Sequence, residues 1–322
     1  MRKVLYFVYV FLLLGCLSRT ALANSYVTAT NTSDFANPQK TQVYVSTATG
    51  SSKGTVVLLH AFIIIAPEIY QHLIEDMTSR GYDVIYPYFQ EAGLGIWKSI
   101  DLLGLIGLKW TSVNHDTWTN NACQGIRWAL NHSLAYEHDS AHVSRQPSDH
   151  LVVFGHSIGG AIGYNIASRC PDIGRKIDGL LMANAILDPT KMIEAQSSSL
   201  PIPAPQTINL KYAGPFNKFP ILFLTGEHDH WGTPAQGQDF LDAAVYSSDK
   251  KIMMALGPDA NHLAPTTDAG PAGELLAHFG VMETLGGNIE LNRMDTDYYT
   301  PAILHLLSGG SPRTFVPSLE AL

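Results

Sequence analysis

The sequence predicts an α/β protein in which a mostly parallel sheet carries helices on both faces. Short apolar runs rich in β-branched residues recur along the chain, and such runs are typical of buried strands. Segments with apolar residues at helical spacing separate these runs, and strands that alternate with helices build parallel sheets covered on both sides. The 322 residues are 46% hydrophobic and 15% charged, which suffices for a large core and excludes a disordered or coiled-coil chain.

The first half of the expected fold contains four strands and two helices. The strands are short apolar runs, at residues 42–45, 55–59, 83–86 and 151–154. A turn of glycine and serine residues joins the first two strands. Residues 68–80 place four apolar side chains on one helical face, and Gly81 is expected to end that helix. A second helix is expected over residues 117–131.

The second half continues the alternation. Three more buried strands are expected, at residues 179–182, 221–224 and 251–255. Helices are expected over residues 161–168 and 301–307, the latter stopped by two glycines. Residues 188–219 include a proline-rich stretch, which we interpret as an insertion over the sheet edge rather than a linker. Residues 24–322 are therefore expected to form one domain.

The N-terminal segment is predicted to be a targeting signal. Two basic residues precede an apolar run at residues 4–14, which is too short to cross a bilayer comfortably, and residues 21–23 match a signal-peptidase site. We therefore expect residues 1–23 to be a signal peptide and the mature protein to be secreted or periplasmic. A short membrane anchor remains an alternative, as does a lipid anchor on Cys16, because residues 13–16 resemble a lipoprotein cleavage box.

Charge and cysteine content bear on the expected partners of the protein and on the state of its cysteines. The chain has 20 basic and 28 acidic side chains, a formal net charge of −8 and no run of lysine or arginine, so nucleic acid is not an expected partner. Beyond the signal segment two cysteines remain, Cys123 and Cys170. In an oxidising compartment they would form a disulfide, whereas two buried free thiols are the alternative.

One segment carries the strongest chemical signal. The strand expected at residues 151–154 runs into Gly155-His156-Ser157-Ile158-Gly159 and then into a helix, the context of a GxSxG nucleophile elbow. The glycines leave room for a sharp turn that exposes the Ser157 hydroxyl at the carboxyl edge of the sheet. The amide of Ile158 lies at the start of the helix, where it can stabilise an oxyanion.

A serine hydroxyl needs a base to take its proton and a carboxylate to orient that base. Asp229 follows the strand at residues 221–224, and His262 follows the strand at residues 251–255. The order Ser, Asp, His along the chain is the order typical of this architecture. We therefore predict a triad of Ser157, Asp229 and His262.

Other residues remain open for these roles. Asp188 or Glu227 are alternatives for the acid, and His278 is the reserve for the base. His228 and His230 form a pair that suggests metal binding, but no third ligand with zinc-like spacing accompanies them. We therefore expect no metal.

Together these motifs resemble the α/β-hydrolase superfamily over about residues 55–262. The matching residues are a strand that ends in His60-Ala61-Phe62, the elbow at residues 155–160, Gly226-Glu227-His228-Asp229 and Asn261-His262. The spacing is most similar to dienelactone hydrolases, chlorophyllases and polyester hydrolases. The resemblance implies an eight-stranded, mostly parallel sheet, a serine hydrolase reaction and no cofactor.

One departure from the family pattern concerns the second oxyanion donor. Members commonly carry His-Gly after this strand, whereas Ala61 follows His60 here. In the family the donor is a backbone amide just after the strand, so the resemblance implies Phe62 for that role beside Ile158. A Cβ at position 61 could alter the loop, and loss of one oxyanion donor typically lowers turnover roughly 10²–10³-fold.

The predicted function is that of a secreted carboxylic ester hydrolase, an esterase or lipase that works through an acyl-enzyme. A serine peptidase or amidase, and a weakly catalytic ligand-binding protein of the same fold, are the alternatives. Residues 93–110 are strongly apolar and are interpreted either as a core helix or as a lid for a lipid-like ester that transiently contacts a membrane surface. The residues expected to contact the small-molecule substrate are Ile63, Trp97, Trp110 and Trp231.

Overall fold

The computed structural model describes most of the predicted domain. The described residues are 27–30, 42–46, 52–61, 67–90, 115–131, 134–138, 141–145, 148, 150–186, 214–266 and 292–317. The expected signal peptide with Cys16, the apolar segment at residues 93–110 and most of the expected insertion lie outside them. Within the described residues, no helix is both long and apolar enough to span a membrane.

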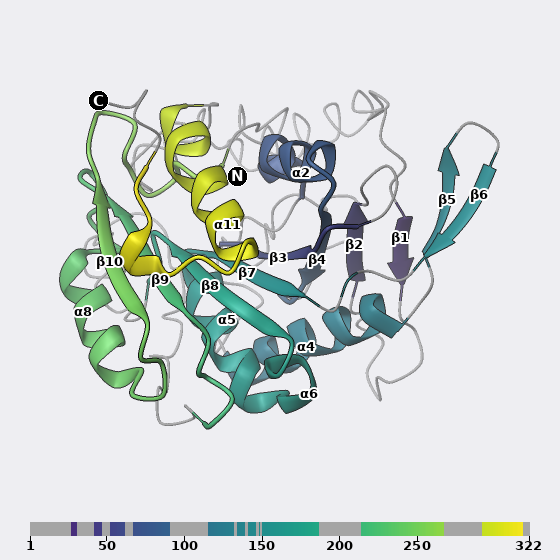
Figure 1. Ribbon diagram of the computed structural model, residues 1–322, viewed down its shortest axis with the longest axis horizontal. Helices are drawn as coiled ribbons and strands as arrows, with labels where there is room; N and C mark the ends of the chain where they lie inside the picture. The colour runs from purple at the N-terminus through teal and green to yellow at the C-terminus, as the bar shows by residue number, and fades with distance from the viewer. Residues whose placement is uncertain are drawn as a thin grey trace, which may run out of the picture.

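Eight strands form one sheet, as the resemblance implies (Figure 1). Their order is β1-β2-β4-β3-β7-β8-β9-β10. Neighbours from β4 to β10 are parallel, and β2 runs antiparallel to both β1 and β4. The strands are β1 (Val27–Thr30), β2 (Gln42–Ser46), β3 (Thr55–Leu59), β4 (Asp83–Tyr88), β7 (Leu151–His156), β8 (Ile177–Ala183), β9 (Ile221–Gly226) and β10 (Lys250–Ala255). Every expected strand is therefore confirmed, and β1 is an additional strand at the edge.

The strands β2 and β3 are consecutive among the expected elements but do not pair with each other. β4 lies between them, with Thr55 of β3 opposite Asp83 and Gln42 of β2 opposite Tyr88. On its other side β3 pairs in parallel with β7. All five residues of β3 are buried, and an interior place in the sheet gives such a strand backbone partners on both sides.

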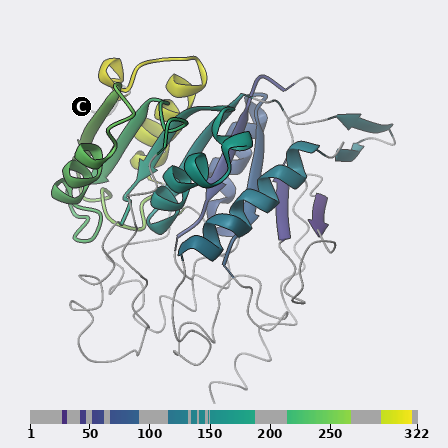
Figure 2. The same cartoon turned by 90° about the horizontal axis from the view of Figure 1, so that it is seen from below.

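Helices cover both faces of the sheet (Figure 1, Figure 2). One face carries α4 (His115–Asn131), α5 (Ile158–Arg169), α6 (Pro171–Gly174) and α8 (Pro234–Ala243), and the other carries α2 (Gln71–Ser79) and α11 (Thr300–Leu307). The four expected helices are confirmed with small changes in their bounds. The first begins as a 3-10 turn, η1 (Pro67–Tyr70), and Gly81 follows α2 at φ +96°, as expected of a glycine that ends a helix.

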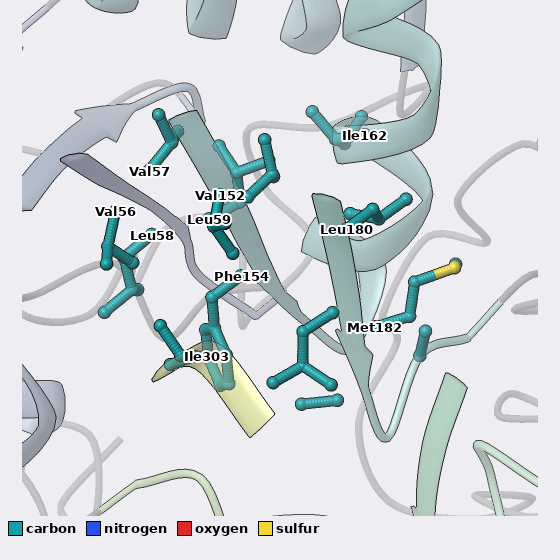
Figure 3. Close-up of a cluster of buried hydrophobic side chains, with 14 of the residues drawn as sticks. Val56, Val57, Leu58, Leu59, Val152, Phe154, Ile162, Leu180, Met182 and Ile303 are labelled. Atoms are coloured by element: carbon teal, nitrogen blue, oxygen red, sulfur yellow. The ribbon is translucent and has the colours of Figure 1, made fainter. Parts of the chain in front are cut away.

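Part of the core lies around the central strands, where Leu59, Phe154 and Leu180 are among the buried side chains (Figure 3). Leu59, Val153 and Leu180 come from β3, β7 and β8 and all lie near Gly163 of α5. On the opposite face, the Phe154 ring packs against Tyr299, with 5.9 Å between the ring centroids. These strands are buried on both faces, so their positions, and those of the loops that follow them, are fixed by packing.

Besides β1 and α6, several other elements were not expected from the sequence. Among them are the hairpin of β5 (Leu134–His138) and β6 (Ala141–Arg145), the helix α8, and the π-helical turn η3 (Met294–Tyr299) before α11. Helix α8 starts with a Thr233 cap and Pro234 in its first turn, but its apolar face is narrow. Short or weakly apolar elements of this kind give little periodic signal.

The two cysteines form a disulfide. Cys123 on α4 is bonded to Cys170, which directly precedes α6. Of the two alternatives left open by the sequence, the disulfide is therefore the one that the structure shows.

Candidate active site

The three predicted triad residues meet at the carboxyl edge of the sheet. Ser157 directly follows β7, Asp229 follows β9, and His262 lies in the segment after β10. Because these strands are parallel, their carboxyl ends lie at the same edge. Three segments that are far apart in the sequence therefore converge at one site.

The predicted nucleophile, Ser157, lies on a strained turn. Ser157 has φ 55° and ψ −122°, a conformation that costs a non-glycine residue about 1–3 kcal/mol. The packing around it enforces this turn. A Cβ at Gly155 would lie 2.5 Å from the backbone of Gly159, and a Cβ at Gly159 would lie 2.2 Å from the carbonyl oxygen of Leu59 on β3. The two motif glycines thus allow α5 to approach the sheet closely enough to hold the serine at its edge.

Asp229 is oriented by its own loop. Its Oδ1 accepts hydrogen bonds from the amides of Trp231, at 2.8 Å, and Gly232, at 2.9 Å. A Cβ at Gly232 would lie 2.7 Å from Asp229 Oδ2, so the close approach of this loop requires glycine. Two backbone donors therefore direct the carboxylate.

His262 connects the predicted acid to the predicted nucleophile. Its Nδ1 lies 3.1 and 3.2 Å from the two carboxylate oxygens of Asp229, and its Nε2 lies 3.0 Å from Ser157 Oγ. All three residues are buried, with exposed fractions of 4% or less. With the Nδ1 proton directed to Asp229, the Nε2 of a neutral His262 is the atom that can accept the serine proton.

The acid stays ionised despite its burial. Burial raises the pKa of Asp229, but the adjacent His262 and the amides of Gly232 and Trp231 outweigh this effect and hold the pKa below its ordinary value. An ionised carboxylate at Nδ1 fixes the tautomer of His262 and stabilises the imidazolium that forms after proton transfer.

One of the two predicted oxyanion donors is described. Ile158 is the first residue of α5, so its amide is among those that a helix leaves without an intrahelical partner. Phe62 lies outside the described residues, but Ala61 before it is described and does not adopt a positive φ. Its amide donates to Tyr70 Oη at 2.9 Å, and its carbonyl accepts from Gln90 at 3.1 Å. The alanine that replaces the family's glycine is therefore accommodated without left-handed strain.

The alternative site residues occupy other places. Glu227 is exposed, and its carboxylate accepts a backbone amide instead of contacting the base. His228 and His230 are also exposed, and among the described residues no group of three His, Cys, Asp or Glu side chains could hold a metal ion. Asp188 and His278 lie outside the described residues.

Of the four residues expected to contact substrate, only Trp231 is described. It is buried, and its ring centroid lies 4.9 Å from that of His262. The tryptophan therefore packs against the base while its amide supports the acid. Ile63, Trp97 and Trp110 lie outside the described residues.

Three buried polar residues around the triad were not anticipated. Tyr70 Oη lies 2.8 Å from His156 Nδ1, and His156 Nε2 lies 2.8 Å from the carbonyl oxygen of His262. Asn184 follows β8 at φ +49° and donates from Nδ2 to the carbonyls of Asn261, at 2.6 Å, and His262, at 3.2 Å. Only His156 carried a sequence signal, its place inside the elbow motif.

The chain resembles known proteins in its structure but not detectably in its sequence. No family model and no curated protein matches the chain. Among solved structures, an esterase from Pyrococcus furiosus matches with a TM-score of 0.54 and 18% identity, over 82% of this chain and 91% of that one. A proline iminopeptidase from Mycobacterium smegmatis matches with a TM-score of 0.50 and 15% identity, over 80% and 96%. DcsB, in complex with its substrate analogue, matches with a TM-score of 0.51 and 12% identity, over 81% and 99%.

These neighbours are covered over nearly their full lengths, and the sheet carries a nucleophile elbow after a central strand. The chain has the α/β-hydrolase fold. In this α/β-hydrolase fold Ser157, Asp229 and His262, the residues of the predicted triad, follow β7, β9 and β10. The hydrogen-bond distances of the triad are an independent observation on this chain.

Proposed function

We propose that this α/β-hydrolase-fold protein is a serine hydrolase that cleaves carboxylic esters through an acyl-enzyme. The observation that carries the proposal is the unbroken set of contacts from Asp229 through His262 to Ser157, with hydrogen-bond distances at both links. Such a set activates a hydroxyl that is otherwise a weak nucleophile. The esterase among the structural neighbours supports an ester as the substrate.

In the first half of the reaction, His262 Nε2 takes the proton of Ser157 Oγ while that oxygen attacks the ester carbonyl carbon. The former carbonyl oxygen becomes an oxyanion, which the amides of Ile158 and Phe62 stabilise. The imidazolium of His262 then gives its proton to the alcohol oxygen as the carbon–oxygen bond breaks. The alcohol leaves, and the acyl group stays on Ser157.

In the second half, water replaces the alcohol. His262 Nε2 takes a proton from the water, whose oxygen attacks the acyl carbon, and the same proton returns to Ser157 Oγ as the acid product leaves. Asp229 stays ionised and hydrogen-bonded to Nδ1 throughout, so that each protonated state of His262 is stabilised in the same orientation.

The proposed site of action is outside the cytosol. The targeting pattern at residues 1–23 supports export, and the Cys123–Cys170 disulfide is of a kind that persists in oxidising compartments. The mass of the mature N-terminus distinguishes a chain that starts at residue 24 from one lipidated on Cys16. The apolar segment at residues 93–110 supports an ester with an apolar acyl group.

Hydrolysis of p-nitrophenyl esters from short to long acyl chains tests this function. We expect hydrolysis by the mature protein and a fall of about 10⁶-fold in kcat for Ser157→Ala at unchanged melting temperature. A long-chain preference would support a lipase, and a short-chain preference a small-ester or polyester hydrolase. Faster cleavage of peptide amides than of esters would favour the peptidase alternative. Absence of both hydrolysis and fluorophosphonate labelling of Ser157 would refute the proposal and favour a ligand-binding protein.

A further inference from the structure

We propose that Tyr70 and His156 form a positioning relay, which ties the backbone beside the expected oxyanion donor Phe62 to the backbone of the base His262. The relay rests on the proposed ester hydrolysis and adds two residues to its machinery. Both residues are fully buried. Both would act by holding the reacting groups in place.

The relay is a continuous run of three hydrogen bonds. It leads from the amide of Ala61 to Tyr70 Oη, over 2.9 Å, from Tyr70 Oη to His156 Nδ1, over 2.8 Å, and from His156 Nε2 to the carbonyl oxygen of His262, over 2.8 Å. No residue in it is more than 4% exposed. It joins the end of β3, the turn η1, the elbow and the segment after β10, which are otherwise separate in the sequence.

The direction of every hydrogen bond in the relay is fixed. A carbonyl oxygen can only accept, so His156 Nε2 carries a proton and donates it to the His262 carbonyl. In the neutral imidazole Nδ1 is then an acceptor, so Tyr70 Oη accepts from the Ala61 amide and donates its own proton to Nδ1. Burial and the adjacent His262 lower the pKa of His156 to about 3, so this imidazole is neutral at ordinary pH. Hydrogen bonds that point the same way polarise and strengthen one another.

The anchored carbonyl belongs to the residue whose position matters most. The ring of His262 has to meet Asp229 and Ser157 at once, yet its backbone lies outside any helix or strand. Its carbonyl is held by His156 Nε2 from the end of β7 and by Asn184 Nδ2 from the end of β8. A displacement of about 1 Å in a catalytic group can lower the rate about 10²-fold. One tyrosine hydroxyl therefore helps to fix the base and the oxyanion side relative to each other.

The first test removes that hydroxyl. Tyr70→Phe keeps the ring that packs edge-on against His156. We expect kcat for a p-nitrophenyl ester to fall about 10- to 100-fold, with KM changed less than about twofold. The rate is expressed per active site, counted by fluorophosphonate titration of Ser157, so that a misfolded fraction does not lower it. The matched control is Tyr164→Phe on α5, because that hydroxyl is buried and has no hydrogen-bond partner in the described part of the chain. The control is expected to keep the wild-type kcat.

The second test asks whether hydrogen bonding or mere packing matters at position 156. The amide of a glutamine offers one acceptor and one donor at nearly the spacing of the two imidazole nitrogens, whereas leucine offers neither. His156→Gln is expected to retain most of the kcat per site, and His156→Leu to lose about as much as Tyr70→Phe. A wild-type kcat in Tyr70→Phe, or equal losses in the glutamine and leucine variants, would overturn the relay.

The relay and the proposed function fail in different ways. If the wild-type protein hydrolyses esters with Ser157 and the Tyr70→Phe rate is unchanged, only the relay is wrong. If the wild-type protein hydrolyses no ester, the relay is judged by nitrogen-15 NMR of its histidines. The expected spectrum shows His156 protonated on Nε2 and unprotonated on Nδ1 down to about pH 4, and a proton on Nδ1 would overturn the relay.

Discussion

The proposed nucleophile and the proposed acid–base pair are held in place by different physical means. Ser157 is positioned by shape, because Gly155 and Gly159 bring α5 against the sheet so closely that no further atom fits. His262 and Asp229 are positioned by hydrogen bonds from several separate segments. Close packing positions one part of the site, and hydrogen bonding positions the other. A packed turn fails abruptly when an atom is added, whereas a hydrogen-bonded loop loses precision one bond at a time.

The largest expected effect comes from adding one methyl group to the packed side. Gly159→Ala would put a Cβ 2.2 Å from the Leu59 carbonyl oxygen, a backbone atom that cannot move aside without shifting β3. We expect loss of detectable ester hydrolysis and about 3 kcal/mol or more of lost stability. Activity and denaturant unfolding measure these two effects.

The matched control for that substitution is Gly54→Ala. Its new methyl group would meet only side-chain carbons, the nearest 3.2 Å away on Leu307, which can adjust. We expect near-wild-type activity in this control. An active, stable Gly159→Ala enzyme would show that the elbow is not held by shape.

The next largest effect is expected from a substitution at Asp229, which is positioned by hydrogen bonds. Asp229→Asn keeps an oxygen for the amides of Trp231 and Gly232, so the loop is expected to fold as before. The neutral amide, however, cannot stabilise the His262 imidazolium and favours the wrong tautomer. We expect kcat to fall about 10⁴-fold with little change in melting temperature. A loss of less than tenfold would mean that another carboxylate serves as the acid.

The elbow was predictable from sequence because all its determinants lie in one short segment. The proximity of Asp229 and His262 to Ser157 was predictable from their positions after apolar strands, although Asp188 and Glu227 could not be separated from Asp229 by position alone. The relay was not predictable, because the partners of Tyr70 lie 9 and 86 residues away and only tertiary packing brings them together.

In the fold, too, features set by the local sequence were predictable, whereas features set by long-range packing were not. Central strands such as β3 and β7 are wholly buried, so their apolar runs identify them without ambiguity. The adjacency of β3 to β4 rather than β2 depends on long-range pairing, which no local pattern records. Helix α8 was missed because few of its side chains, Phe240 and Leu241 among them, are apolar and buried. Its stability comes from contact with the sheet more than from its own sequence.

The smallest effect is expected at Asp295, a buried carboxyl group that hydrogen bonding satisfies only in part. Asp295 on η3 is 1% exposed, and its Oδ2 accepts the Asn292 amide, whereas Oδ1 has no partner in the described part of the chain. Burial raises the pKa of Asp295 to about 8. Between the ordinary carboxyl value near 4 and about 8, the unfolded chain ionises while the folded chain keeps its proton, so stability falls as pH rises.

Asp295→Asn removes this titration and keeps an oxygen for the Asn292 amide. We expect the stability of the variant relative to the wild type to grow from pH 5 to pH 8, by at most about 1.4 kcal/mol per pH unit, with kcat unchanged. Urea unfolding at several pH values measures the difference. A difference that is the same at pH 5 and pH 8 would contradict the raised pKa.

The redox state of the disulfide affects every such measurement of stability. Cys123 and Cys170 are 47 residues apart, and the loop that they close contains β7, the elbow and the whole of α5. A covalent loop of this length restricts the unfolded chain by about 4 kcal/mol in the chain-entropy model. The redox history of a preparation therefore influences how firmly the nucleophile segment is held. Protein made in a reducing cytosol and protein folded under oxidising conditions are two different reference states, and variants can be ranked only within one of them.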